Sequence, residues 1–345
     1  TKRIELFFDD KKVANIPVNI LVENSPMYDR KWKKAKLPKK NKIPKKDLTN
    51  LKFKDVLKKI LSNPNVCSKQ WIWEQYDHTV MGDTIQKPGG DSGVVKVHGT
   101  NKAVAASVDS SAVYCWAHPL TGGKQVVCES WRNLISVGAK PLAITNCLNF
   151  GNPENKEIMG EFAECLEGIK EACEFLDYPV VSGNVSFYNG TNKKNIFPTP
   201  VIGGVGLITK LIKPLNHKFK NEKSILILIG NTNGHLEQSC FLKENYSIID
   251  GKPPEVNLLN EKNNGEIVLN LIYNNLVLSA HDVSSGGLLV ALSEMAISSD
   301  IGVKIDKPKK LKNLFEYFFG EDQGRYILEI DKKNIDKVEK ILKNT

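Results

Sequence analysis

The sequence predicts a mixed α/β protein with two domains. Short apolar segments of strand length alternate with amphipathic helical segments. Strands around residues 141–145 and 180–181 are joined by one helix, with apolar residues at spacings of three and four from Ile158 to Leu176. A length of 345 residues exceeds what one hydrophobic core usually holds, and 41% apolar residues can fill two cores.

Four segments are expected along the chain. The first ends a preceding domain, the second is a basic linker, and the third and fourth are the two α/β domains. Their bounds are residues 1–25, 26–50, 51–212 and 213–345. The first contains predicted strands at Ile4–Phe8 and Val18–Val22 but no core of its own, and the last stops inside an apparent helix. We therefore expect a piece of a longer polypeptide, cut at both ends.

The elements of the two domains follow from their apolar spacing. A helix over residues 51–61 is predicted first, and a second helix opens near Thr121 and closes at Gly138. The remaining expected elements are strands at 94–97, 103–108, 141–145, 201–208, 224–229, 277–280 and 326–330, and helices at 158–176 and 288–297.

Composition limits the classes of function. The formal net charge is +9, but ten basic residues and no acidic one lie between Arg30 and Lys46, so the rest is close to neutral. This segment is typical of a solvated linker rather than a nucleic-acid-binding surface. The longest candidate for a membrane span, Ile225–Ile229, has only strand length. Seven cysteines without a CxxC pair indicate neither a disulfide framework nor a zinc site, which favours a reducing cytoplasm. Together with the charge distribution and the lack of a membrane-spanning segment, this predicts a cytoplasmic protein without a membrane or nucleic-acid partner.

Polar and small residues follow the two strands that the crossover helix joins. They are Thr145–Pro153 and Ser182–Ser186. Parallel strands joined in this way place their carboxyl ends at the same edge of the sheet, so we expect the two loops to converge. Glycine there allows a phosphate to approach the backbone, and carboxamide oxygens can ligate a hard cation. The alternative is an ordinary turn, with Asn152 as a helix N-cap.

Two further polar motifs lie near the end of the chain. His281–Asp282 precedes a serine- and glycine-rich turn. The pair either ligates a metal or leads into a helix whose N-terminus is capped by a serine, and we favour the serine cap. The Gly320–Arg325 loop is interpreted as a turn held by an internal Glu–Arg pair. No hydrolytic triad or Walker loop is recognisable.

Taken together, these motifs closely resemble the synthetase subunit of phosphoribosylformylglycinamidine synthase, the PurL type, in order and spacing over nearly the whole chain. The matching segments are Tyr76–Val80, Glu129–Asn133, Gly138–Pro141, Thr145–Pro153, Ser182–Ser186, His281–Gly287 and Gly320–Tyr326. The resemblance is to the second half of that protein. It implies the second copy of a two-domain PurM-like synthetase fold, which is shared with aminoimidazole ribonucleotide synthetase.

The resemblance implies ATP-dependent conversion of formylglycinamide ribonucleotide to formylglycinamidine ribonucleotide in purine biosynthesis, with ammonia derived from glutamine. Position by position, it implies ATP contacts at Asn146 and Gly183, a Mg²⁺ ligand at Asn184 and a substrate contact at Ser186. Many relatives carry Asp where Asn146 stands. The implied partners are the missing amino-terminal half, a glutaminase subunit of the PurQ type and a small PurS-type subunit.

The catalytic His and the main carboxylate metal ligands of the family lie in the half that is absent here. No catalytic residue is therefore expected in this chain, and the chain alone is expected to be inactive. Three alternatives stay open: another PurM-like ATP-dependent synthetase or kinase, a nucleotide-binding half with a structural role, and a basic nucleic-acid-binding protein.

Overall fold

The computed structural model describes residues 2–38, 51–192, 194–210, 215–306 and 313–343. The chain divides into two compact units, Thr1–Lys31 and Trp32–Thr345. The predicted domain boundary at residues 212–213 and residues 39–50 of the predicted basic linker lie outside the described residues.

The first unit is a hairpin followed by a short helix. Strand β1 (Arg3–Phe8) pairs antiparallel with β2 (Lys11–Pro17) through Asp9 and Asp10, whose φ angles of 44° and 58° suit a tight two-residue turn. The strand predicted at residues 4–8 is confirmed. The strand predicted at Val18–Val22 is wrong, since these residues form helix α1 (Val18–Val22). Periodicity does not distinguish strand from helix in an apolar run this short.

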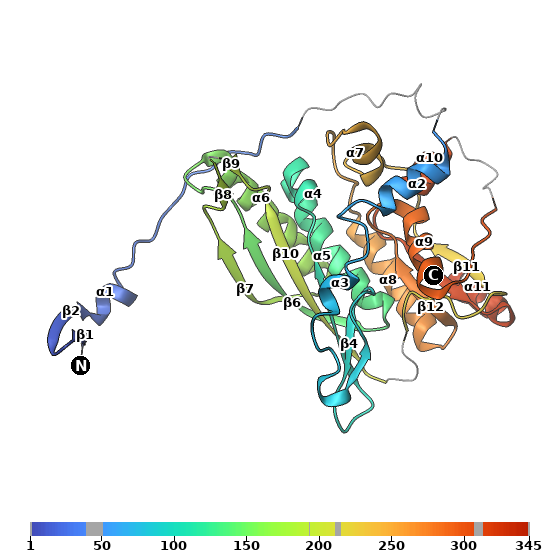
Figure 1. Cartoon of the computed structure of the whole chain (residues 1–345), viewed down its shortest axis with the longest axis horizontal. Helices are drawn as coiled ribbons and strands as arrows, with labels where there is room; N and C mark the ends of the chain where they lie inside the picture. The colour runs from blue at the N-terminus through green and yellow to red at the C-terminus, as the bar shows by residue number, and fades with distance from the viewer. Residues whose placement is uncertain (1, 39–50, 193, 211–214, 307–312, 344–345) are drawn as a thin grey trace. The chain divides into compact units, whose positions relative to one another are not determined.

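A six-stranded sheet lies at the centre of one half of the second unit (Figure 1). The strand order is β3–β4–β5–β10–β6–β7, in which β6 and β7 are parallel and the other neighbours are antiparallel. The bounds are β3 (Thr84–Gln86), β4 (Gly93–Lys96), β5 (Ala103–Asp109), β6 (Lys140–Asn149), β7 (Val180–Ser186) and β10 (Thr199–Ile208).

Two long helices cover one face of this sheet. They are α5 (Pro119–Ser136) and α6 (Lys156–Leu176), and the short α4 (Ala112–Ala117) precedes them. Alternate residues of the strands, such as Ile144 and Leu148 in β6, are buried against the helices. The opposite face is exposed in this chain, where Val108 and Val205 are 74% and 42% accessible. The predicted β–α–β unit of strand, crossover helix and parallel strand is confirmed.

A three-stranded antiparallel sheet forms the second half of this unit, in the order β11–β13–β12. Its predicted strands and the predicted helices at 51–61 and 288–297 are confirmed, with small shifts of their ends. The bounds of these and the remaining elements are β11 (Ile225–Ile229), β12 (Val277–Asp282), β13 (Tyr326–Ile330), β8 (Gly190–Thr191), β9 (Lys194–Asn195), α2 (Phe53–Leu61), α3 (Gln70–Trp73), α7 (Cys240–Tyr246), α8 (Leu258–Tyr273), α9 (Gly287–Ser299), α10 (Leu314–Phe319) and α11 (Ile335–Lys343), with single 3₁₀ turns at Val80–Gly82 and Lys332–Asn334.

Helix α5 joins the two sheets, because it contacts the first sheet and also α8 and β12. The approach is close at Gly265 of α8, where a Cβ atom would lie 2.2 Å from the ring of Trp131. The largest cluster of buried apolar residues accordingly contains side chains from both halves, among them Leu134 and Tyr326. Within the described part of the chain, no helix combines the length and apolar character needed to cross a bilayer.

Candidate functional site

The four residues assigned by resemblance lie in neighbouring strands. In the parallel pair, Asn146 is opposite Gly183, and Ser186 is opposite Asn149. Asn184 follows Gly183 and is opposite Cys147. The prediction that these residues converge at one sheet edge agrees with this register. The prediction that they form loops is wrong, because pairing with β10 extends β6 to Asn149 and carries the polar run into the sheet.

The side chains of this strip point to opposite faces of the sheet, because successive residues of a strand alternate. Asn146 faces the helices, and a Cβ atom on Gly183 would lie 2.0 Å from its Oδ1. On the open face, the amide of Asn184 donates to Ser186 Oγ at 3.1 Å and contacts Cys147 Sγ at 3.9 Å. The predicted ATP contacts and the predicted Mg²⁺ and substrate contacts therefore flank the same edge strand from its two sides.

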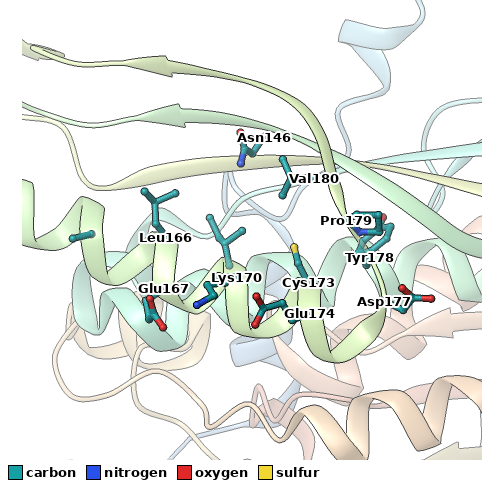
Figure 2. A pocket seen from close by; sticks show the side chains of 12 residues that line it. Asn146, Leu166, Glu167, Lys170, Cys173, Glu174, Asp177, Tyr178, Pro179 and Val180 are labelled. Atoms are coloured by element: carbon teal, nitrogen blue, oxygen red, sulfur yellow. The ribbon is translucent and has the colours of Figure 1, made fainter. Parts of the chain in front are cut away.

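A cavity of about 570 Å³ lies between α6 and the β6–β7 edge. In Figure 2, Leu166 and Cys173 project from α6 towards the strands that carry Asn146 and Val180. The charged residues lining it are Lys170, Glu167, Glu174 and Asp177. One lysine against three carboxylates does not favour a triphosphate in the part of this cavity that α6 lines.

The loop after β6 is held by its own amides. Asn195 Oδ1 accepts from the backbone N–H of Asn152 at 3.0 Å, and Asn149 Nδ2 donates to the carbonyl of Thr199 at 3.3 Å. The N-cap of α6 is Asn155, whose Oδ1 accepts from the N–H of Glu157. The prediction of Asn152 as the N-cap is wrong, because a turn closed by the N–H of Asn155 donating to the carbonyl of Asn152 at 3.1 Å comes before the helix begins.

The glycine-rich loop after β11 has the composition of an anion-binding loop, but a carboxylate of the chain fills it. Asp322 accepts from the backbone N–H groups of Asn233, Gly234 and His235 at 2.8–3.2 Å. The expected Glu–Arg pair of the 320–325 turn is also wrong. Arg325 instead donates to the carbonyl of Asp322 at 2.9 Å.

Glu321 lies in a buried junction, where its hydrogen-bond partners do not include Arg325. It accepts from the hydroxyl of Tyr114 and from the backbone N–H groups of Cys240 and Gly286. Burial raises the pKa of Glu321, while these donors lower it, so the net shift is upward. Glu321 therefore ties α4 to the first residue of α7 and to the residue that precedes α9.

The serine cap expected after His281–Asp282 is not formed. The N-cap of α9 is Gly286, at φ 83°, and no side chain caps the helix there. His281 contacts Asp91 Oδ1 through Nδ1 at 2.6 Å and Glu294 Oε2 through Nε2 at 3.2 Å. Asp282 lies 3.5 Å from Arg132 Nε.

A buried charged network centred on Arg132 was not foreseen from the sequence. Its guanidinium donates to Glu261 at 2.7 Å and to Gln323 at 2.9 Å, and all three residues come from different elements. Burial disfavours the charge of Arg132, but Glu261 and Asp282 more than offset this, so its pKa is raised. In the sequence, Arg132 stood out only as part of the Glu129–Asn133 motif inside α5, which does not identify its partners.

Two family models match consecutive parts of the chain: AIR synthase related protein, N-terminal domain, over residues 89–208, and AIR synthase related protein, C-terminal domain, over residues 223–345. The chain is 66% identical over 342 residues to the phosphoribosylformylglycinamidine synthase subunit PurL of Pelagibacter ubique (strain HTCC1062), and 46% identical over 336 residues to that of Rhodopseudomonas palustris (strain BisB5). These matches cover 99% and 97% of the chain.

The chain belongs to the PurL-type phosphoribosylformylglycinamidine synthase family. It spans about half the length of the curated relatives it matches, namely 47% and 45% of these two. This confirms the family resemblance inferred from the motifs.

Solved structures agree on the fold. T. maritima PurL complexed with ATP matches 96% of the chain and 46% of that protein, with a TM-score of 0.62 and 24% identity. The same protein complexed with FGAR matches with a TM-score of 0.63 at 23% identity, over 96% and 45% of the two chains. The protein tt0281 from Thermus thermophilus matches over 82% and 91% of the two chains, with a TM-score of 0.59 and 17% identity. The PurM-like two-domain fold is thereby confirmed.

Proposed function

We propose that this chain supplies part of the active site of a phosphoribosylformylglycinamidine synthase, which converts formylglycinamide ribonucleotide to the amidine at the expense of ATP in purine biosynthesis. The observation that carries the proposal is the 66% identity over 99% of the chain to a PurL subunit. The solved PurL structures include complexes with ATP, ADP and FGAR, which are the nucleotide and substrate classes that we propose for this chain.

The β6–β7 edge suits a nucleotide contact. Gly183 has no side chain at the point where Asn146 approaches, so its backbone is accessible beside a carboxamide. A ligand that crosses the exposed edge of β7 can reach Asn146 and Gly183 on one side and Asn184 and Ser186 on the other. Asn146 then offers hydrogen bonds to the nucleotide, and the hydroxyl of Ser186 to the ribonucleotide substrate.

Among the site residues described above, only Asn184 is suited to act as a Mg²⁺ ligand, so this chain would supply one ligand of a Mg²⁺ site. The amide of Asn184 donates to Ser186, which leaves its carbonyl oxygen as the group suited to a hard cation. Mg²⁺ prefers six oxygen ligands, commonly including carboxylates, substrate phosphates and water. We propose that Asn184 contributes one oxygen and that the other ligands come from the nucleotide and from the rest of the enzyme.

The exposed face of the six-stranded sheet is the proposed contact with the remaining half of the same enzyme. Apolar side chains such as Val104, Val108 and Val205 occupy it, and their burial would stabilise an assembly. One solved relative is described as PurLQS from Thermotoga maritima. We propose a glutaminase subunit of the PurQ type and a small PurS-type subunit as further partners, which would supply and deliver the ammonia.

In the proposed reaction, no residue of this chain forms a covalent bond with a reactant. ATP with Mg²⁺ would supply the phosphoryl group that activates the formylglycinamide oxygen, and ammonia would then displace phosphate. The chain positions the reactants through the carboxamides of Asn146 and Asn184 and through the backbone at Gly183. Positioned dipoles of this kind stabilise charge in the transition state without reorganising during the reaction.

Complementation tests the proposal. Residues 1–345 are purified and assayed for ATP hydrolysis that depends on formylglycinamide ribonucleotide and ammonia, alone and after mixing with the complementary half of the Pelagibacter ubique protein. We expect no activity alone and formation of the amidine in the mixture. N184A should abolish the restored activity, whereas N274A, which removes an exposed amide at the end of α8, should leave it unchanged.

Two outcomes would contradict the proposal. Turnover by residues 1–345 alone at the rate of the mixture would place a complete active site in this chain, with Asp282 and Glu321 as the first residues to test. Nucleotide binding in a mixture that never turns over would favour a structural role for the bound nucleotide.

A further inference from the structure

A compact group of potential metal ligands lies where the two halves of the second unit meet. Asp91 precedes β4, and His281 and Asp282 end β12, yet their ligand atoms all lie within 4.8 Å of one another. His281 Nδ1 is 2.6 Å from Asp91 Oδ1 and 3.9 Å from Asp282 Oδ1. The side chains of Asp91 and Asp282 are 4% and 3% exposed, so two carboxylates share a nearly dry site.

One buried atom of this group, Oδ2 of Asp91, has no hydrogen-bond partner among the described residues. A second histidine packs beside the group: the His217 ring lies 5.4 Å from that of His281. An unpaired buried carboxylate oxygen is costly, and either an ordered water or a cation satisfies it; the imidazole and second carboxylate beside it favour a cation.

The surroundings of His281 match those of a metal-binding histidine. Such a histidine uses one ring nitrogen for the metal and donates the other N–H to a carboxylate or carbonyl. Here Nδ1 faces the two aspartates, while Nε2 contacts Glu294 on α9 at 3.2 Å. Asp282 is held from its other side by Arg132.

We propose that Asp91, His281 and Asp282 bind one divalent transition-metal ion of the zinc type, with a water molecule as the fourth ligand. A set of one imidazole, two carboxylates and a water suits Zn²⁺ in tetrahedral geometry better than Mg²⁺, which prefers six oxygens. The ion would replace the proton that His281 and Asp91 share. Since Asp91 lies in the region matched by the N-terminal family model and His281 in that matched by the C-terminal one, the ion would clamp the two together.

Metal binding by the full chain tests this inference. The protein is stripped with a chelator, equilibrated with Zn²⁺, Co²⁺ or Mg²⁺, separated from free metal and analysed for metal content. We expect one Zn²⁺ per chain, a higher melting temperature in its presence, no comparable retention of Mg²⁺ and the visible absorption of tetrahedral Co²⁺. H281Q and D91N should lose the bound ion, and E294Q should bind it about 10–100-fold more weakly.

The matched control is H98Q. His98 also contacts an aspartate, Asp83, at 3.4 Å, but its side chain is 84% exposed, so H98Q should retain one Zn²⁺. If H281Q or D91N does not fold, the His281 ring nitrogens are observed by NMR in the original chain, where Zn²⁺ should remove the proton from Nδ1. Three outcomes would overturn the inference: no retained Zn²⁺, equal retention by H281Q, or a His281 ring that stays doubly protonated with Zn²⁺ present.

Discussion

Alanine at Gly183 should disturb both the sheet edge and the proposed nucleotide contact. The φ angle of Gly183 is not in the left-handed region, so the backbone itself accepts alanine and the effect is steric. The new Cβ would lie 2.0 Å from Oδ1 of Asn146 and 2.8 Å from its backbone oxygen. The first contact can be relieved if the Asn146 side chain rotates away, whereas the second requires the strands to shift.

The size of the effect follows from these two contacts. Overpacking by one carbon in a well-packed site costs about 1–3 kcal/mol, and we place G183A in that range. Removing the Asn146 side chain eliminates the shorter contact. The double variant G183A/N146A should therefore be more stable than the sum of the single variants predicts, with a coupling of about 1 kcal/mol or more.

The coupling is obtained from the free energies of unfolding in urea of four proteins: the unsubstituted chain, G183A, N146A and the double variant. The effect on function is measured as ATP affinity after complementation with the other half of the enzyme. We expect the double variant to recover stability without recovering ATP affinity, because Asn146 is then absent. V181A, which truncates a side chain that is 70% exposed in the same strand, is the matched control and should change neither quantity by much. If G183A has the same stability and ATP affinity as the unsubstituted chain, both the close contact and the assignment of this site are wrong.

Three further predictions concern stability. R132M leaves Glu261 buried without its partner and should lower the free energy of unfolding, measured in urea, by about 3–5 kcal/mol. The double variant R132M/E261Q should recover part of this loss. A decrease below about 1 kcal/mol in R132M would contradict the buried network. Burial, followed by Glu157, raises the pKa of the half-buried Glu161 from 4.5 to about 7, so the folded state retains a proton that the unfolded state has lost, and stability falls between these pH values as pH rises. E161Q should therefore stabilise the protein at pH 8 by about 1–2 kcal/mol after solvent screening and change little at pH 4.5, as thermal unfolding at both pH values will show; equal effects at both would refute the shift. In G160A the new Cβ would lie 1.9 Å from the Lys33 carbonyl, so trypsin should cut near Lys33 faster while the midpoint of unfolding is unchanged. In G168A the new Cβ would lie 2.0 Å from the Leu120 carbonyl, between α5 and α6, so the midpoint of unfolding should fall. Unchanged trypsin cleavage of G160A would show that the segment around Lys33 does not pack on α6.

The local pattern of the sequence was sufficient for the elements and for the family. The spacing of Ile158 to Leu176 predicted α6, the flanking apolar runs predicted β6 and β7, and a crossover helix makes those strands parallel. These features depend on residues that are close in the chain. The same holds for the order and spacing of the family motifs, which the comparisons confirm.

Only the tertiary structure decided which side of the sheet each candidate residue faces. Strand β6 continues to Asn149 because β10 pairs with it, and this register places Asn146 and Asn184 on opposite faces. Asp322, far along the chain, fills the glycine-rich loop after β11. The pairing of Asp91 with His281 likewise joins residues 190 positions apart. Sequence periodicity carries no information about such contacts, since each depends on how separate elements pack.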